Sequence, residues 1–201
     1  GDMADKLIRD IEAVGEELSL DVSCYLTKDV LDGERAARDF ARALNGEEAC
    51  VYACGGDGTI NEVINGLYGF DNVYAGFIPA GTGNDLVRNF PDAGDFRDVR
   101  AQLQGTFSQM DLIRYEGVIS GVETNRLCAN MINIGLDCNV VEHAGRLKKK
   151  PFIAGSMAYL LGVAIVFIQK KTINLMIKSG DQTLSDGEVL LCAVANGSFC
   201  G

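Results

Sequence analysis

The first segment whose residues could do chemistry is Gly-Gly-Asp-Gly-Thr-Ile-Asn-Glu, residues 55–62. Glycines lack a Cβ atom and let the backbone approach a phosphate closely, and a helix that begins there adds unpaired N–H groups and partial positive charge. Asp57 would repel a phosphate unless a cation lies between them, and Mg²⁺, bound directly or through water, would remove that conflict. The alternative is a plain turn from a strand into a helix, with Asp57 as the helix cap.

A second segment, Pro-Ala-Gly-Thr-Gly-Asn-Asp at residues 79–85, repeats this chemistry. Thr82 and Asn84 can form hydrogen bonds, and Asp85 stands where the next helix is expected to begin. Taken alone, the segment is also good turn chemistry. Two such loops favour a nucleotide-phosphate cleft, to which Asp111 would add a third carboxylate for the water ligands of Mg²⁺. Otherwise Asp111 is an exposed residue at the start of a strand.

Several other kinds of site are missing from the sequence. It contains no Gly-x-x-x-x-Gly-Lys-Ser/Thr loop and no Gly-x-Ser-x-Gly turn, so neither a P-loop lysine nor a serine nucleophile of that type is expected. The seven cysteines form no Cys-x-x-Cys pair and His143 is the single histidine, which argues against a Cys/His zinc site.

The elements that must position the two loops follow from apolar spacing. The first half predicts helices over 4–18, 32–44, 59–68 and 86–90, and strands over 20–26, 49–54 and 74–78. Such alternation is typical of βαβ units on a parallel sheet, where ligands bind beyond the carboxyl ends of the strands. Both glycine-rich loops follow strands, so the predicted sheet would bring them together.

The second half of the chain predicts more strands. They are expected over residues 108–115, 125–134, 172–178 and 188–195, with helices over 137–147 and 153–168. The fold class is therefore α/β, with a nucleotide-binding domain over residues 1–113 and an incomplete β-rich domain over 114–201.

The two loops, read as Gly-Gly-Asp-Gly-Thr-Ile-Asn-Glu-Val-Ile-Asn-Gly and Ile-Pro-Ala-Gly-Thr-Gly-Asn-Asp-Leu-Val-Arg, closely resemble the diacylglycerol kinase catalytic-domain family, which includes bacterial soluble lipid kinases and the sphingosine and ceramide kinases. Asn133–Asp137 and Val194–Gly197 resemble later segments of the same family, more weakly. The resemblance implies an NAD-kinase-like parallel-sheet domain, followed by the start of a β-sandwich that holds the lipid acceptor. It also implies transfer of the ATP γ-phosphoryl group to a lipid hydroxyl such as that of diacylglycerol.

The resemblance further implies a set of site residues. ATP would contact residues before and within both loops, namely Thr27, Gly55, Gly56, Asp57, Gly58, Thr59, Ile60, Asn61, Glu62, Gly81, Thr82, Gly83 and Asn84. Mg²⁺ would be organised by Asp57, Asp85 and Asp111. The family's opening strand is expected before Gly1 and its catalytic carboxylate beyond Gly201, so this chain is expected to bind nucleotide but turn over poorly.

The composition and charge of the chain limit which kinds of partner it could bind. The chain has 201 residues and a formal net charge of −10, which argues against duplex nucleic acid because phosphates would be repelled. An odd number of cysteines without a secretory signal indicates a cytoplasmic protein. An apolar run of 12 residues is too short to span a membrane. It is flanked by six basic residues, namely Arg146, Lys148, Lys149, Lys150, Lys170 and Lys171. These residues either contact an anionic membrane surface or are the solvated ends of a core helix.

Three alternatives stay open at this stage. The chain could phosphorylate NAD or another small molecule, because those enzymes share the Gly-Gly-Asp-Gly motif, or it could be a non-catalytic module that binds nucleotide or lipid. The sequence also leaves open whether the protein is a homodimer.

Overall fold

The computed structural model describes residues 2–90, 95–119, 121–135 and 172–199. The contacts divide the chain into two compact units, one of residues 1–130 and 196–201 and one of residues 131–195. The predicted division after residue 113 is a functional one, between a nucleotide domain and an acceptor domain, and it stays a prediction.

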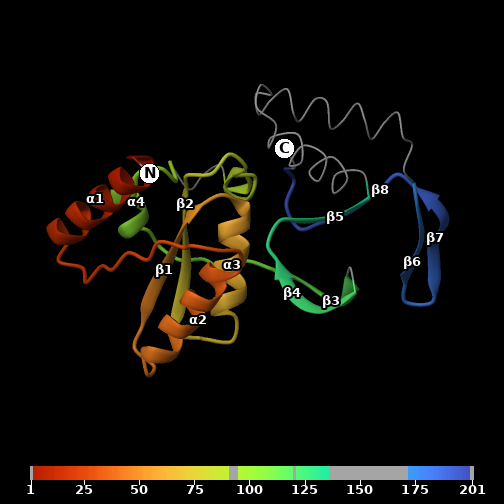
Figure 1. The fold of residues 1–201 in the computed structure, drawn as a ribbon, viewed down its shortest axis with the longest axis horizontal. Helices are drawn as coiled ribbons and strands as arrows, with labels where there is room; N and C mark the ends of the chain where they lie inside the picture. The colour runs from red at the N-terminus through yellow and green to blue at the C-terminus, as the bar shows by residue number, and fades with distance from the viewer. Residues whose placement is uncertain (1, 91–94, 120, 136–171, 200–201) are drawn as a thin grey trace. The chain divides into compact units, whose positions relative to one another are not determined.

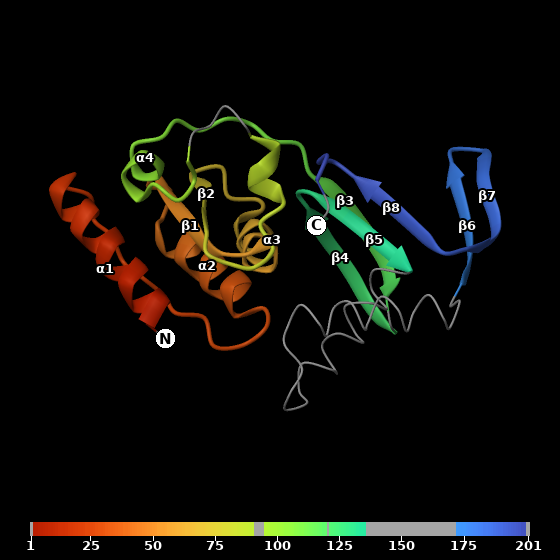
Figure 2. The ribbon, with the colours of Figure 1, turned by 90° about the horizontal axis from the view of Figure 1, so that it is seen from above.

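The first unit is built on a parallel pair of strands, β1 (Ala49–Gly55) and β2 (Val73–Pro79), joined by α3 (Asp57–Leu67). The predicted parallel sheet with helices is thereby confirmed. α3 packs on both strands and α2 (Asp32–Ala43) packs on α3, whereas α1 (Asp2–Glu17) contacts α4 (Val99–Leu103), which contacts β2. In Figures 1 and 2, α1 and α3 lie on opposite sides of the two strands.

Alternation along β1 explains the two helical layers. Val51 and Ala53 face the buried cluster that α3 fills with Ile60 and Val63. Tyr52 points to the other side, where its hydroxyl donates to the Gln102 carbonyl oxygen of α4 at 2.8 Å. Both faces of β1 are partly covered, which fits the continuous apolar run seen in the sequence.

One predicted strand is wrong. Residues 20–28 form no strand and have no paired neighbour among the described residues. Leu20 is 45% exposed and Leu26 62%, although the alternation of apolar residues at positions 20, 22, 24 and 26 predicted a buried face. Alternation identifies a face that could be buried, but a strand exists only through hydrogen bonds to a neighbour, and the pattern does not specify one.

Most of the antiparallel strands overlap the predicted ones with shifted ends, whereas the strand over residues 182–187 was not predicted. The hairpin of β3 (Ile113–Ile119) and β4 (Val122–Cys128) belongs to the first unit, and its Leu127 joins the α3 core. The strand predicted over 125–134 ends at Cys128 and a new one, β5 (Met131–Gly135), begins after Asn130, because the two segments pair with different partners. The predicted short helix over 86–90 is a 3₁₀ turn, η1 (Leu86–Asn89).

The second unit contains two antiparallel pairs. β5 pairs with β8 (Leu191–Ala195), and β6 (Ile173–Ser179) pairs with β7 (Gln182–Val189) through a polar turn, in which Gly180 has a positive φ of 56°. The strand predicted over 188–195 is split at Leu190 between two pairs. Antiparallel strands are therefore present, and their assembly into a sandwich stays a prediction.

Candidate nucleotide site

The two glycine-rich loops meet at the carboxyl ends of β1 and β2. Gly55 is in register with Pro79, so both strands end at the same level of the sheet. Ala80 N donates to the Gly55 carbonyl oxygen at 3.0 Å, and Asp57 N donates to the Gly83 carbonyl oxygen at 3.0 Å. The expectation that the sheet brings the loops together is confirmed by these backbone bonds.

The Asp57 carboxylate joins the loops a second time. Its Oδ2 accepts from Asp85 N at 3.0 Å and its Oδ1 accepts from Leu86 N at 3.2 Å. Asp57 therefore acts as a cap, as the alternative interpretation had it, but for the η1 turn after the second loop and not for its own helix. The same carboxylate lies where the two loops converge, so its structural role does not remove it from the candidate site.

The glycines of the loops differ in what a side chain at their position would contact. A Cβ on Gly56 would lie 2.7 Å from the Gly83 carbonyl oxygen, and one on Gly81 would lie 2.5 Å from Gly56 N. Those two residues are needed for the loops to pack against each other. Gly58 differs, because a Cβ there would meet no atom within 4 Å. Its lack of a side chain leaves the exposed first turn of α3 open to a ligand.

Asn84 carries an unsatisfied acceptor in the second loop. Its Nδ2 donates to the Gly81 carbonyl oxygen at 2.6 Å, while its Oδ1 is buried with no hydrogen-bond partner among the described residues. Buried polar atoms in native proteins are almost always bonded to protein, water or a ligand. The neighbouring Thr82 and Gly83 are exposed.

The three predicted metal-organising aspartates are placed differently from one another. Asp57 and Asp85 are close, through the bond to Asp85 N, and the Asp85 carboxylate accepts from Arg88 Nη1 at 3.1 Å. Asp111 is exposed just before β3, and its carbonyl oxygen accepts from Asn196 Nδ2 at 2.7 Å. Within the described part of the chain, no three His, Cys, Asp or Glu side chains form a group that could hold a metal ion. The three-aspartate site stays a prediction.

Several side chains that were predicted to contact the nucleotide instead pack against, or form hydrogen bonds with, other residues of the protein. The Ile60 side chain is 2% exposed, in the core. Asn61 Nδ2 donates to the Leu127 carbonyl oxygen at 2.9 Å. The Glu62 carboxylate accepts from Leu31 N at 2.9 Å and Gly33 N at 3.0 Å, so it binds the beginning of α2. Asp32, although of a residue type that often caps helices, does not cap α2, because its side chain accepts from Lys28 N, before the helix.

Two further predicted contacts lie beside these residues. Thr27 is exposed in the segment before α2, and its methyl group lies 3.6 Å from where a Cβ of Gly33 would be, next to Glu62. Thr59 lies against Gly55, since a Cβ on Gly55 would come within 2.7 Å of Thr59 Cβ. Thr27 and Glu62 therefore lie near the same position, and their contacts with a nucleotide stay a prediction.

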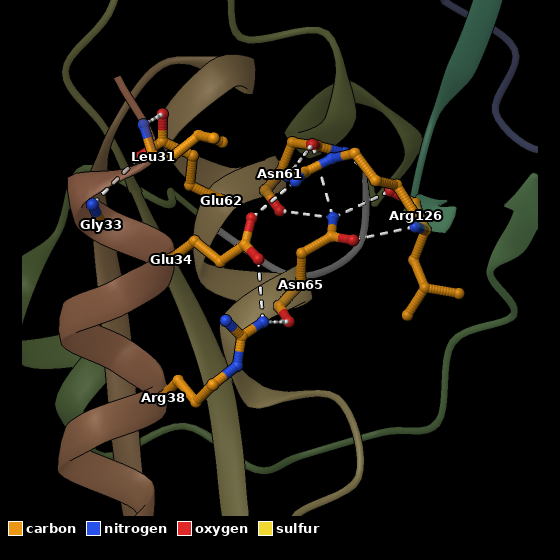
Figure 3. A network of polar contacts seen from close by, with 9 residues as sticks. Leu31, Gly33, Glu34, Arg38, Asn61, Glu62, Asn65 and Arg126 are labelled. Carbon is orange, nitrogen blue, oxygen red and sulfur yellow. Dashed lines mark hydrogen bonds and ion pairs between the residues drawn. The ribbon is translucent and has the colours of Figure 1, made fainter. Parts of the chain in front are cut away.

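A polar network that sequence reasoning missed docks the β3–β4 hairpin on α3 (Figure 3). Asn65 Nδ2 donates to the Leu127 carbonyl oxygen and Leu127 N donates to Asn65 Oδ1, both at 2.9 Å. The Glu34 carboxylate of α2 forms ion pairs with Arg126 at 2.7 Å and Arg38 at 2.8 Å. The available signal was Asn61 and Asn65, four residues apart on an otherwise apolar helix face.

A second group of contacts that sequence reasoning missed joins residues 196–199 to η1. Ser198 N donates to Asn89 Oδ1 at 2.7 Å, and Asn89 Nδ2 donates to Asn130 Oδ1 at 3.2 Å. Arg88 lies over the Phe199 ring, 4.5 Å from its centre. The segment that resembles a later family motif therefore lies beside the turn that follows the second glycine loop.

Some predictions fall outside the described residues. They are the helices over 137–147 and 153–168, His143, and the basic residues on either side of the apolar run. In the part of the chain that the structure describes, no helix has the length and apolar character needed to cross a membrane.

Comparison with known proteins agrees with this geometry. A family model described as "Diacylglycerol kinase catalytic domain" matches residues 1–115, more than half of the chain and both glycine-rich loops. The chain belongs to the diacylglycerol kinase catalytic-domain family.

Named relatives are of the same kind. A "Putative lipid kinase" of Staphylococcus aureus (strain MRSA252) is 26% identical over 170 residues, which cover 84% of this chain and 51% of that protein. A second, from strain JH9, is 27% identical over 153 residues, covering 75% of this chain and 47% of that protein. The chain thus spans about half the length of the curated relatives it matches.

A solved structure shares the fold. "A putative diacylglycerol kinase from Bacillus anthracis str. Sterne" superposes with a TM-score of 0.55 at 23% sequence identity, covering 86% of this chain and 53% of that one. This likeness supports the mixed α/β architecture with its parallel strands.

Proposed function

We propose that this chain supplies the nucleotide-binding part of an ATP- and Mg²⁺-dependent lipid kinase. The observation that carries the proposal is the joined pair of glycine-rich loops at the carboxyl ends of β1 and β2, locked by Asp57 and open at Gly58. Phosphoryl transfer depends mainly on positioning and charge neutralisation, and a rigid pair of loops with exposed backbone is suited to both.

In the proposed reaction, a lipid hydroxyl oxygen forms a bond to the γ-phosphorus of ATP while the bond to the β–γ bridging oxygen breaks. ADP leaves with that oxygen, and the hydroxyl proton passes to a general base. No described residue is assigned as that base. The described residues would instead hold the triphosphate, through backbone N–H groups of the first turn of α3 and the exposed second loop.

The residues present fit Mg²⁺ and a triphosphate. Carboxylate and amide oxygens are hard ligands of the type Mg²⁺ prefers, and the second loop offers the Asp85 carboxylate and the unpartnered Asn84 Oδ1 beside Asp57. When bound, Mg²⁺ would neutralise phosphate charge, which is needed beside two aspartates. Direct and water-mediated coordination are both compatible with these groups.

A lipid acceptor is favoured by the relatives, which are named as lipid kinases and not as NAD kinases. We include in the proposal a cytoplasmic enzyme that contacts an anionic membrane surface through Arg146, Lys148, Lys149, Lys150, Lys170 and Lys171. Homodimer formation is compatible with the proposal and not required by it.

The test is calorimetric titration of ATP into the protein, with Mg²⁺ and with EDTA, for the wild type and for Gly58→Ala. We expect Mg²⁺-dependent binding that Gly58→Ala weakens by at least tenfold while the melting temperature is unchanged or higher, since the added methyl group meets only the ligand. ATP binding that is equal in both proteins would contradict this placement of the phosphates.

The acceptor is tested separately on the full-length protein. Radiolabelled ATP is offered with diacylglycerol, ceramide, sphingosine or NAD, and the labelled product is identified. Label in a lipid supports the proposed acceptor class, whereas label in NAD alone would replace it with the small-molecule kinase, and ATP binding without any transfer would favour the non-catalytic module.

A further inference from the structure

A cavity of about 270 Å³ lies in the first unit, between α2, α3 and the β3–β4 hairpin. None of its lining residues belongs to the two glycine-rich loops. Its charged lining consists of Arg38, Arg114, Arg126 and one acid, Glu34. In a chain with a formal net charge of −10, this cavity therefore has an excess of two positive charges.

Glu34 orients two of the arginines without neutralising all three. Its Oε1 accepts from Arg38 Nη2 at 2.8 Å and its Oε2 lies 2.7 Å from Arg126 Nη1, as Figure 3 shows for the carboxylate between the two guanidinium groups. Burial raises the pKa of Glu34, but the hydrogen bonds and charges of the two arginines outweigh it and hold the pKa below its usual range. Glu34 is thus ionised at neutral pH.

Each guanidinium keeps a nitrogen for a ligand. Arg38 uses Nη2 alone, for Glu34 and the Asn65 carbonyl oxygen. Arg126 uses its two Nη atoms, for Glu34 and Asn61, and Arg114 uses Nε for Asn125 and Nη2 for a 3.9 Å pair with exposed Glu116. Among the described residues, two nitrogens of Arg38 and one each of Arg114 and Arg126 have no hydrogen-bond partner. The three side chains line one cavity from three elements, α2, β3 and β4.

The packing of the unit does not require all of these charges. The Glu34–Arg126 pair and the Asn65–Leu127 bonds already hold α2, α3 and β4 together. Arg114 contributes to neither contact and its side chain is 57% exposed, yet it stands at the same cavity. Arg114 adds a third positive charge to a cavity in which Arg38 and Arg126 share one carboxylate, and a bound anion would offset that excess.

We propose that this cavity is a phosphate-binding site, for a phosphomonoester presented either by a small soluble molecule or by a phospholipid head group. Arginine is suited to this chemistry because its planar donors bind phosphate oxygens in pairs, and an excess of two positive charges matches a phosphomonoester dianion. The volume lies at the lower end for small-molecule sites, which fits a phosphate with a small substituent better than a nucleotide. The proposal is independent of ATP binding at the glycine-rich loops.

The test uses Arg114→Gln, with Arg42→Gln as the matched control. Arg42 lies four residues beyond Arg38 on α2, is 65% exposed and pairs only with Asp39 among the described residues, at 3.6 Å. Inorganic phosphate and glycerol 3-phosphate are titrated calorimetrically into the intact chain. We expect saturable binding to the wild type, weakened about tenfold or more in Arg114→Gln and unchanged in Arg42→Gln.

Vesicles distinguish the two sources of the phosphate. Phosphatidylcholine vesicles containing phosphatidic acid carry a phosphomonoester, whereas those containing phosphatidylserine carry a phosphodiester. Arg114-dependent binding to the first and not to the second supports a lipid head group, and Arg114-dependent binding of glycerol 3-phosphate alone supports a soluble ligand.

Two results would overturn the proposal. One is the absence of saturable binding for every phosphate probe. The other is equal weakening by Arg114→Gln and Arg42→Gln, which would show general charge screening. Phosphate bound at the glycine-rich loops would not depend on Arg114, so failure of the kinase proposal and failure of this one give different results.

Discussion

At the scale of single residues, the candidate site depends on glycines that lack a Cβ atom as well as on polar side chains. Gly81 packs against the backbone of Gly56, and Asp57 bridges to the amides of Asp85 and Leu86. Gly58 has open space in front of it. Glycines of one motif therefore divide into those that join the loops and one that leaves room for a ligand.

That division gives a stability prediction. Gly81→Ala should destabilise the protein by about 1–3 kcal/mol, because the new methyl group would meet backbone atoms that cannot rotate away. Gly58→Ala is the control and should lose no stability, since alanine favours a helix over glycine by about 1 kcal/mol. Urea denaturation of both variants measures the difference. Equal midpoints would show that the loops do not pack as described.

At the scale of elements, the beginning of α2 is stabilised from another helix. Leu31 has a left-handed φ of 65° and no side-chain cap of its own, and Glu62 of α3 accepts from the amides of Leu31 and Gly33. A carboxylate at a helix N-terminus is also favoured by the helix dipole. Glu62 thus links the first-loop helix to the helix that carries Glu34 and Arg38.

We expect Glu62→Ala to lower the free energy of unfolding by about 0.5–2 kcal/mol, the range for losing a helix cap. Glu62→Gln keeps an acceptor oxygen and should lose less, and exposed Glu48→Ala should have no effect. Denaturant titration with circular dichroism detection measures these differences. If Glu62→Ala has the stability of Glu48→Ala, the capping role is refuted and Glu62 is free for the nucleotide.

At the scale of the whole molecule, one arginine of this acidic chain joins elements that are far apart in the sequence. Arg126 of β4 reaches Glu34 of α2, which is only 14% exposed, while α3 lies between them through Asn65. The arrangement couples the packing of the hairpin to the ionisation of one partly buried acid.

This coupling predicts a dependence of stability on pH. The lowered pKa of Glu34 means that its ionised form stabilises the folded state fully above its ordinary value of 4.5, and that this contribution is lost as pH falls through the lower folded value. Glu34→Gln should therefore be less stable than wild type at pH 7, by about 1–3 kcal/mol, with the gap closing on acidification. Unfolding at several pH values tests this, and a gap that stays constant with pH would contradict it.

The sequence by itself determined what depends on local order. Apolar periodicity predicted α1, α2, α3, β1 and β2 close to their observed ends, and the glycine-rich composition of residues 55–59 and 79–85 placed both loops after strands. These features follow from neighbouring residues, because helix and strand periodicity and turn chemistry act over a few positions.

Only the tertiary structure decided which groups meet across long separations. Glu62 bonds to a residue 31 positions away and Asn65 to one 62 positions away, and neither bond has a local signature. For the same reason residues 20–26 could carry a strand pattern without being a strand, and Asp57 could be expected to cap its own helix while it caps the next loop. Partners for polar groups and strand edges are chosen by the packing of the whole unit, where an unpaired buried group is costly, and that choice is not written in any single segment.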